Sequence, residues 1–163
     1  MIPSAAFYTI GVYGSTSEEF FNKLISNNID TFIDIRRRRA VRGSVYSFVN
    51  SNRLQSKLKE LGINYFHILD LAPTNEIRNI QKEADRTAGV LKRERNKLGD
   101  KFTEEYSRQI LENYNFSDLI YKLEEVNAYK AVLFCVEKEV EACHRSLVAD
   151  KLEQRYSVTI NHL

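Results

Sequence analysis

The chain has 163 residues, of which 43% are hydrophobic, and its formal net charge is +2 at pH 7. This length allows one hydrophobic core and is too short for two domains of ordinary size, and so small a net charge does not by itself indicate a nucleic-acid-binding protein. No apolar run approaches the roughly 20 residues of a membrane-spanning helix, and the N-terminus lacks the pattern of a secretory signal. We therefore predict one soluble cytoplasmic domain over residues 1–163, with no membrane partner.

Short β-branched and aromatic runs alternate with helical patterns along the chain. Ser15 and Thr16 each precede a glutamate by three residues, which is the capping-box pattern of a helix start, and Gly62 suits a left-handed helix end. The strands are predicted at residues 7–13, 30–36, 63–69, 131–136 and 157–163. The helices are predicted after residue 15, at residues 52–61, in several pieces between residues 73 and 129, with breaks at Gly89 and Gly99, and at residues 143–156.

This alternation predicts an α/β fold, with a mostly parallel sheet of about five strands between two layers of helices in a Rossmann-like arrangement. Ligands of such sheets bind beyond the carboxyl ends of the strands. Several chemically versatile residues follow predicted strands and should meet at that edge, namely Tyr13, Gly14, Asp34, Arg36, His67, Cys135 and Glu137.

Basic residues are clustered at two places. The loop Arg36–Arg42 contains five arginines, among them Arg36 and Arg37 at the end of the second predicted strand. Since neighbouring guanidinium groups repel one another, an anionic partner is the economical explanation of this loop. The second cluster, residues 92–97, is interpreted as an exposed helix face because acidic residues are interspersed with it.

The segment "FCVEKEVEACHRSLVAD", together with "YTIG", "IDIRRRR" and "INYFHILDLAP", closely resembles the DUF488 family over nearly the entire chain. Its most specific part is Cys135, then Glu137, then the run Cys143–Ser146. Val12 departs from the family pattern, which commonly has a histidine there. The resemblance implies an intracellular protein and carries no assigned reaction, so the chemistry has to come from the residues.

A helix that opens near Cys143 would direct free backbone amides and a positive dipole end toward the crevice. Arg145 would add a bidentate donor for phosphate and Ser146 a hydroxyl group, while a thiol placed there would have a lowered pKa. These features predict the binding of a phosphorylated small molecule or a nucleic acid. If the protein is an enzyme, Cys143 is the candidate nucleophile, and His144 or Glu137 would transfer protons.

Each candidate also has a structural reading. Cys135 can be a small buried hydrophobe, and Asp34 and Glu137 can be ion-pair partners of Arg36 and Arg145, which would lower the pKa values of both carboxyl groups. A zinc site formed by Cys135, Cys143, His144 and His67 is the metal alternative, since thiolate and imidazole are good zinc ligands. Adjacent Cys and His side chains rarely point at one ion and a fourth ligand is not specified, so we predict no metal site and no cofactor. A redox pair of Cys135 and Cys143 stays open.

A non-catalytic nucleic-acid-binding or regulatory module is the alternative function. Its electrostatic footprint would be the loop Arg36–Arg42. Tyr46 and Phe48 would stack on bases beside that loop.

Overall fold

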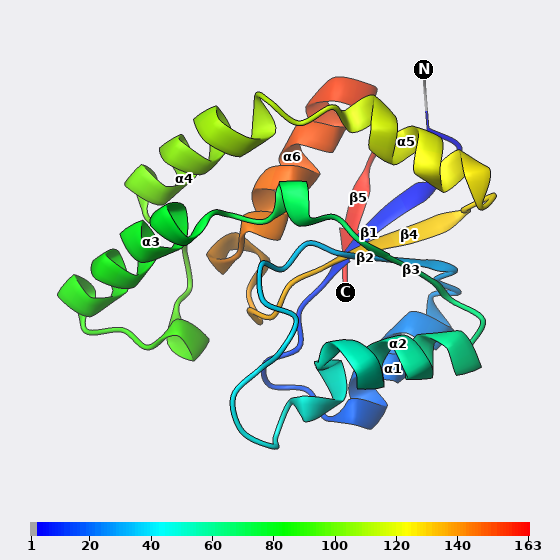
Figure 1. The fold of residues 1–163 in the computed structure, drawn as a ribbon, viewed down its shortest axis with the longest axis horizontal. Helices are drawn as coiled ribbons and strands as arrows, with labels where there is room; N and C mark the ends of the chain where they lie inside the picture. The colour runs from blue at the N-terminus through cyan, green and yellow to red at the C-terminus, as the bar shows by residue number, and fades with distance from the viewer. Residues whose placement is uncertain (1–2) are drawn as a thin grey trace.

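The computed structural model describes residues 3–163 and has a fully parallel five-stranded sheet at its centre (Figure 1). The strand order is β3-β2-β4-β1-β5. The strands are β1 (Ala6–Ile10), β2 (Thr31–Asp34), β3 (Asn64–His67), β4 (Lys130–Phe134) and β5 (Ile160–His162). The helices are α1 (Ser17–Ser26), α2 (Ser51–Glu60), α3 (Asn75–Ala88), α4 (Asp100–Tyr106), α5 (Phe116–Glu125) and α6 (His144–Tyr156).

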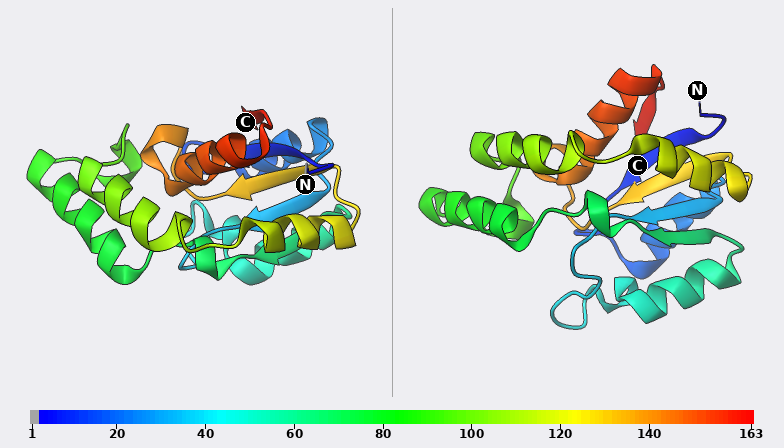
Figure 2. Two further views of the ribbon diagram at one scale, coloured as in Figure 1. Left: turned by 90° about the horizontal axis from the view of Figure 1, so that it is seen from above. Right: turned by 45° about the horizontal axis from the view of Figure 1, so that its top comes forward.

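Helices cover both faces of the sheet. In Figures 1 and 2, α1 and α2 lie on one face and α5 and α6 on the other. This division follows from right-handed crossovers, because the chain moves outward from β1 to β3 and then returns to place β4 and β5. The predicted α/β fold, with a parallel sheet between two helical layers, is therefore confirmed.

The core explains the pattern of the central strands. Every residue of β2 is buried, and β4 is buried after Lys130, since both strands have helices on both sides. Phe20 of α1 packs against Phe32 and Phe134 with ring centroids 6.3 and 5.5 Å apart. Contacts of this kind tie the helical layer to the middle of the sheet.

Several helix ends follow the local sequence signals. Thr16 and Glu19 form the reciprocal capping box of α1, in which Glu19 Oε2 accepts from the Thr16 amide at 2.9 Å and Thr16 Oγ1 accepts from the Glu19 amide at 3.1 Å. Gly89 ends α3 in the left-handed conformation, and Gly99 is the N-cap of α4. Both predicted breaks in the central helical region are thus present.

Helices α3 and α4 extend beyond the carboxyl ends of the strands rather than lying flat on the sheet (Figures 1 and 2). They enclose the edge at which parallel sheets bind ligands. None of the helices within residues 3–163 combines the length and the apolar character needed to cross a membrane.

Candidate functional site

A cavity of about 610 Å³ lies at the carboxyl ends of the strands. Its walls come from the loops after β1, β2 and β4, from one face of α3, from the segment 91–98 and from the first residue of α6. The cavity is therefore assembled from segments distant in sequence. It occupies the position at which open parallel sheets place their ligands.

Positive charge dominates the wall of this cavity. The lining includes nine basic and two acidic side chains. The basic residues are Arg36, Arg37, Arg38, Arg42, Arg78, Lys82, Lys92, Arg93 and Arg95, and the acidic ones are Asp85 and Glu137.

Most of these cations lack a carboxylate partner. Among the residues that the structure describes, six of the nine have no ion-pair partner: Arg37, Arg38, Arg42, Arg78, Lys82 and Arg93. Burial lowers the pKa of Arg78, and the charges of Arg38 and Arg37 lower it further. The wall thus carries positive charge that the protein itself does not neutralise.

Arg36 is the most deeply buried of the cations, with 3% of its surface exposed. Its Nε and Nη2 atoms donate to the Asp34 carboxylate at 2.9 and 2.8 Å, and Nη2 also donates to the carbonyl oxygen of Val49 at 2.9 Å. The Arg36 Nη1 atom is buried and has no hydrogen-bond partner within residues 3–163. The Asp34–Arg36 ion pair foreseen from the sequence is present, and it leaves one guanidinium donor unused.

The second basic cluster belongs to the cavity. Residues Lys92–Glu94 form a 3₁₀ turn, and Lys92, Arg93 and Arg95 line the cavity. The exposure predicted for residues 92–97 is confirmed, since all of them except Arg95 are exposed, but residues 92–94 form a short 3₁₀ turn rather than a helix face, and three of the basic side chains also line the cavity. The sequence did not indicate this second position, because it depends on how the turn packs against the strand ends.

Arg95 organises the acidic side chains of the wall. Its guanidinium donates to Asp85 Oδ2 at 2.7 Å, to Glu137 Oε1 at 2.9 Å and to the Ala142 carbonyl oxygen. Because both carboxylates bind this one arginine, they neutralise little of the positive charge on the other basic side chains of the wall.

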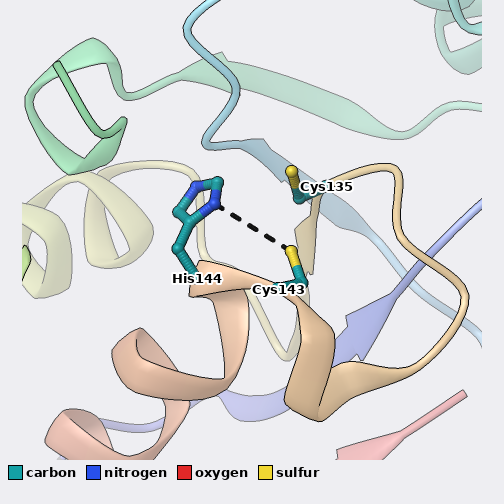
Figure 3. Close-up of side chains that lie close together, drawn as sticks. All are labelled: Cys135, Cys143 and His144. Atoms are coloured by element: carbon teal, nitrogen blue, oxygen red, sulfur yellow. Dashed lines mark hydrogen bonds between the residues drawn. The ribbon is translucent and has the colours of Figure 1, made fainter. Parts of the chain in front are cut away.

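Both cysteines and one histidine meet beside the cavity. The Sγ atoms of Cys135 and Cys143 and a ring nitrogen of His144 all lie within 4.8 Å of one another, and all three residues are buried (Figure 3). His144 Nδ1 is 4.0 Å from Cys143 Sγ. Cys135 and His144 line the cavity, and both cysteines are free thiols.

The two thiols differ in acidity. The hydrogen bond with Cys143 and burial together raise the pKa of Cys135 well above its usual range. Burial would also raise the pKa of Cys143, but the hydrogen bond with Cys135, the charge of Arg145 and the contact with His144 lower that pKa well below its usual range. Of the two thiols, Cys143 is therefore the more acidic.

Glu137 departs from the expected pairing. Burial raises the pKa of its carboxyl group, and its ion-pair partners are Arg95 and Lys92 rather than Arg145. Its Oε2 atom accepts a hydrogen bond from the Cys135 thiol at 3.4 Å. The expected lowering of this pKa by Arg145 is therefore wrong, since desolvation outweighs the cations nearby.

Arg145 holds the loop after β4. Its Nη1 and Nη2 atoms donate to the carbonyl oxygens of Glu137 and Lys138 at 2.6 and 3.1 Å. Ser146 Oγ donates to the carbonyl oxygen of Cys143 at 2.8 Å. Cys143, Arg145 and Ser146 are not part of the cavity wall, which takes only His144 from the start of α6.

Other predicted residues support the wall from outside. His67 Nε2 hydrogen-bonds to the Arg36 carbonyl oxygen at 2.8 Å, and the Gly14 amide donates to the Tyr46 hydroxyl at 2.8 Å. Phe48 is buried and packs on Phe20, so it presents no face for base stacking.

Residues on α3 were not predicted for the site. Arg78, Gln81, Lys82 and Asp85 line the cavity, and their spacing of three and four residues places them on one helix face. This spacing is readable in the sequence. Only the tertiary fold turns that face toward the strand ends.

Comparison with known proteins identifies the family of the chain but no activity. Neither a curated protein nor a solved structure matches the chain. The family model for the domain of unknown function DUF488 matches residues 16–152. This match covers most of the chain, and the protein therefore belongs to the DUF488 family.

Proposed function

We propose that this protein binds a phosphorylated small molecule of about nucleotide size in the basic cavity. The observation that carries the proposal is the group of six cations around one cavity without an ion-pair partner among residues 3–163. Like charges held this close repel one another, and an anionic ligand would relieve that repulsion. Arginine is also the side chain whose geometry best matches phosphate oxygens.

The size of the cavity supports a small ligand. Pockets for small molecules and cofactors usually enclose about 300 to 1,000 Å³, and this one encloses about 610 Å³. Arg36 also lines the cavity, and its buried Nη1 atom has no hydrogen-bond partner within residues 3–163, so a ligand oxygen that reached this atom would satisfy it.

Aromatic packing favours a small ligand over a nucleic-acid strand. Arg93 lies over the rings of Tyr13 and Tyr46, at 5.4 and 5.5 Å from their centroids. These rings are occupied within the protein, and Phe48 is in the core. The stacking platform that a single strand would need is therefore not free.

Nucleophilic chemistry at Cys143 stays a prediction. Its lowered pKa suits a nucleophile, but the residue is 1% exposed and lies behind the cavity wall. The proposed function is accordingly ligand binding, whether or not a reaction follows.

A thermal-shift screen tests the proposal. Inorganic phosphate, pyrophosphate, nucleoside mono-, di- and triphosphates and the matching uncharged nucleosides would each be added to the whole chain at physiological ionic strength. A ligand present at about 100 times its Kd stabilises the folded protein by about 2.7 kcal/mol. We expect phosphorylated compounds to raise Tm and the nucleosides to leave it unchanged, whereas equal shifts from both groups would contradict the proposal.

Variants of unpaired cations locate the binding. Arg38 and Lys82 are exposed, line the cavity from two different segments and have no ion-pair partner within residues 3–163. Because hydrogen bonds to charged groups contribute about 1.5–3 kcal/mol, Arg38→Ala and Lys82→Ala should each weaken binding about tenfold to a hundredfold. Lys122→Ala removes an exposed charge from α5, away from the cavity, and should leave binding unchanged.

A further inference from the structure

We propose that Cys135, Cys143 and His144 bind a zinc ion through three protein ligands, with the fourth coordination position directed toward the basic cavity. The three ligand atoms converge within 4.8 Å of one another, and two of the three residues line the cavity (Figure 3). The proposal of this zinc site is based on the convergence of the three ligand atoms and does not depend on the proposed anion.

The separations suit a tetrahedral ion. With Zn–S bonds of about 2.3 Å and Zn–N bonds of about 2.05 Å, tetrahedral geometry places sulfur atoms about 3.8 Å apart and a sulfur about 3.6 Å from nitrogen. His144 Nδ1 lies 4.0 Å from Cys143 Sγ. Small side-chain rotations would bring the atoms to bonding distance, so no backbone rearrangement is needed.

The chain turns adjacent side chains toward one point, which sequence reasoning considered rare. Cys143 is the N-cap of α6 with an extended backbone, at φ −134° and ψ 143°, and His144 is the first helical residue. This abrupt change of backbone conformation between neighbours lets both side chains face Cys135 across the loop, as Figure 3 shows.

The histidine is oriented as metal-binding imidazoles are. His144 Nε2 hydrogen-bonds to the carbonyl oxygen of Ile35 at 2.8 Å, which leaves Nδ1 facing the sulfur atoms. Metal-bound histidines usually donate their second ring N–H to such a carbonyl group. The ring of Tyr106 packs edge-on against the imidazole, with centroids 5.5 Å apart, and restricts its rotation.

Charge and donor type favour zinc over the hard cations. Two thiolates neutralise one Zn²⁺ ion, so the occupied site adds no net charge to a buried position. Calcium and magnesium prefer oxygen ligands, and this cluster offers sulfur and nitrogen. The chain has only two cysteines, and the fold brings both of them to this point.

The fourth coordination position of the zinc ion faces the cavity. Three protein ligands and one exchangeable position are typical of catalytic zinc sites, whereas structural sites have four protein ligands. A water molecule or a phosphate oxygen could occupy the position beside Glu137. Only this last assignment, of a phosphate oxygen, rests on the proposed function.

Metal analysis tests the site directly. The full chain would be purified under reducing conditions, its metal content measured by mass spectrometry, and the metal-free protein titrated with zinc alone against a competing chelator. We expect about one zinc ion to bind per chain. No zinc in the purified protein together with no uptake by the reduced metal-free protein would overturn the proposal, and so would a Cys135–Cys143 disulfide that forms under these conditions.

Variants identify the ligands. Cys135→Ser and Cys143→Ser should each weaken zinc binding about a hundredfold or more, whereas the control His162→Asn changes an exposed histidine at β5 and should have no effect. Unchanged affinity in either cysteine variant would overturn the assignment. If these variants fail to fold, the absorption spectrum of the wild-type protein loaded with cobalt tests the site instead. We expect the intense bands of tetrahedral cobalt together with thiolate-to-metal charge transfer. The weak spectrum of octahedral cobalt would contradict the site.

The same variants separate this proposal from the proposed function. Arg38→Ala should lose affinity for pyrophosphate and keep its zinc. Cys135→Ser should lose zinc while its pyrophosphate affinity changes less than that of Arg38→Ala. Pyrophosphate binding by a protein unable to bind zinc would overturn the metal site alone, and zinc binding without pyrophosphate binding would overturn the anion cavity alone.

Discussion

Asp34 is buried completely and receives several donors. Its carboxylate accepts from the Arg36 guanidinium and backbone amide, and from the Tyr65 hydroxyl at 2.7 Å. All of these donors belong to the protein itself, so the carboxylate is engaged within the wall. Its effect is to fix Arg36 in the cavity wall.

Asp34→Asn should therefore reduce stability. The substitution leaves the buried Arg36 charge without its counter-ion, and breaking a buried ion pair costs about 3–5 kcal/mol. The free energy of unfolding from urea titrations measures the loss. Asp70→Asn, at an exposed position, is the control, and a loss below about 1 kcal/mol for Asp34→Asn would contradict this account.

Tyr65 gives the same network a dependence on alkaline pH. Burial and the neighbouring Asp34 carboxylate raise the pKa of Tyr65 to about 12, against about 10 in an unfolded chain. Since the folded protein keeps this proton longer than the unfolded chain, the stabilisation is complete below pH 10 and is lost as pH rises toward 12.

We expect Tyr65→Phe to be less stable than the wild type at pH 8, because it lacks the hydrogen bond to Asp34. The difference should narrow by pH 11, as the unfolded wild-type chain releases its proton. Urea unfolding at both pH values measures it, with the exposed Tyr129→Phe as the control. A difference that stays constant between these pH values would show that Tyr65 has no raised pKa.

At the scale of elements, two strand-end loops determine the position of Cys135 and Glu137. The amides of Val12 and Tyr13, after β1, both donate to the Val136 carbonyl oxygen, at 3.1 and 3.0 Å. Gly11 makes this approach possible, since a Cβ atom there would lie 2.0 Å from the Glu137 carbonyl oxygen.

Gly11→Ala should thus displace the loop after β4. Overpacking of this kind costs about 1–3 kcal/mol, and the shift should also disturb the hydrogen bonds from Arg145 to the loop. Gly99→Ala is a matched control, because its Cβ would find its nearest atom at 3.5 Å. Thermal unfolding of both variants measures the effect, and equal stability of the two would argue against close loop packing.

Local sequence signals were sufficient to predict the helices and strands, but the observed ends of these elements differ from the predicted ones. Capping by Thr16 and Glu19 and the left-handed Gly62 depend on neighbouring residues alone, so the sequence contains them. The strand predicted at 7–13 ends at Ile10, because the next residues bond to the loop after β4 instead of continuing the sheet. Such long-range pairing has no local signature.

At the scale of the whole molecule, the cavity concentrates charge that the overall composition hides. The net charge is only +2, yet nine basic side chains surround one cavity. Sequence reasoning placed Arg36, Arg37, Cys135, Glu137 and His144 near the strand ends, and all five line the cavity. It missed the face of α3 and the turn at residues 92–94, since their position depends on how the segment between β3 and β4 packs against the carboxyl ends of the strands.

Ionic strength should distinguish an enclosed ligand from a nucleic-acid strand. For single strands, the logarithm of affinity falls with the logarithm of salt concentration by about 0.7 for each phosphate neutralised. We expect a single-stranded oligonucleotide to bind more weakly than a nucleoside triphosphate. Tight oligonucleotide binding with a slope corresponding to several phosphates, measured by fluorescence anisotropy, would favour the nucleic-acid alternative.

Calorimetric titration of the full chain with inorganic pyrophosphate is the most direct test of the basic cavity. The account predicts saturable binding at one site, weakened about tenfold to a hundredfold by Arg38→Ala and unchanged by Lys122→Ala. Equal affinities of the wild type and both variants, or no binding to the wild type, would contradict it.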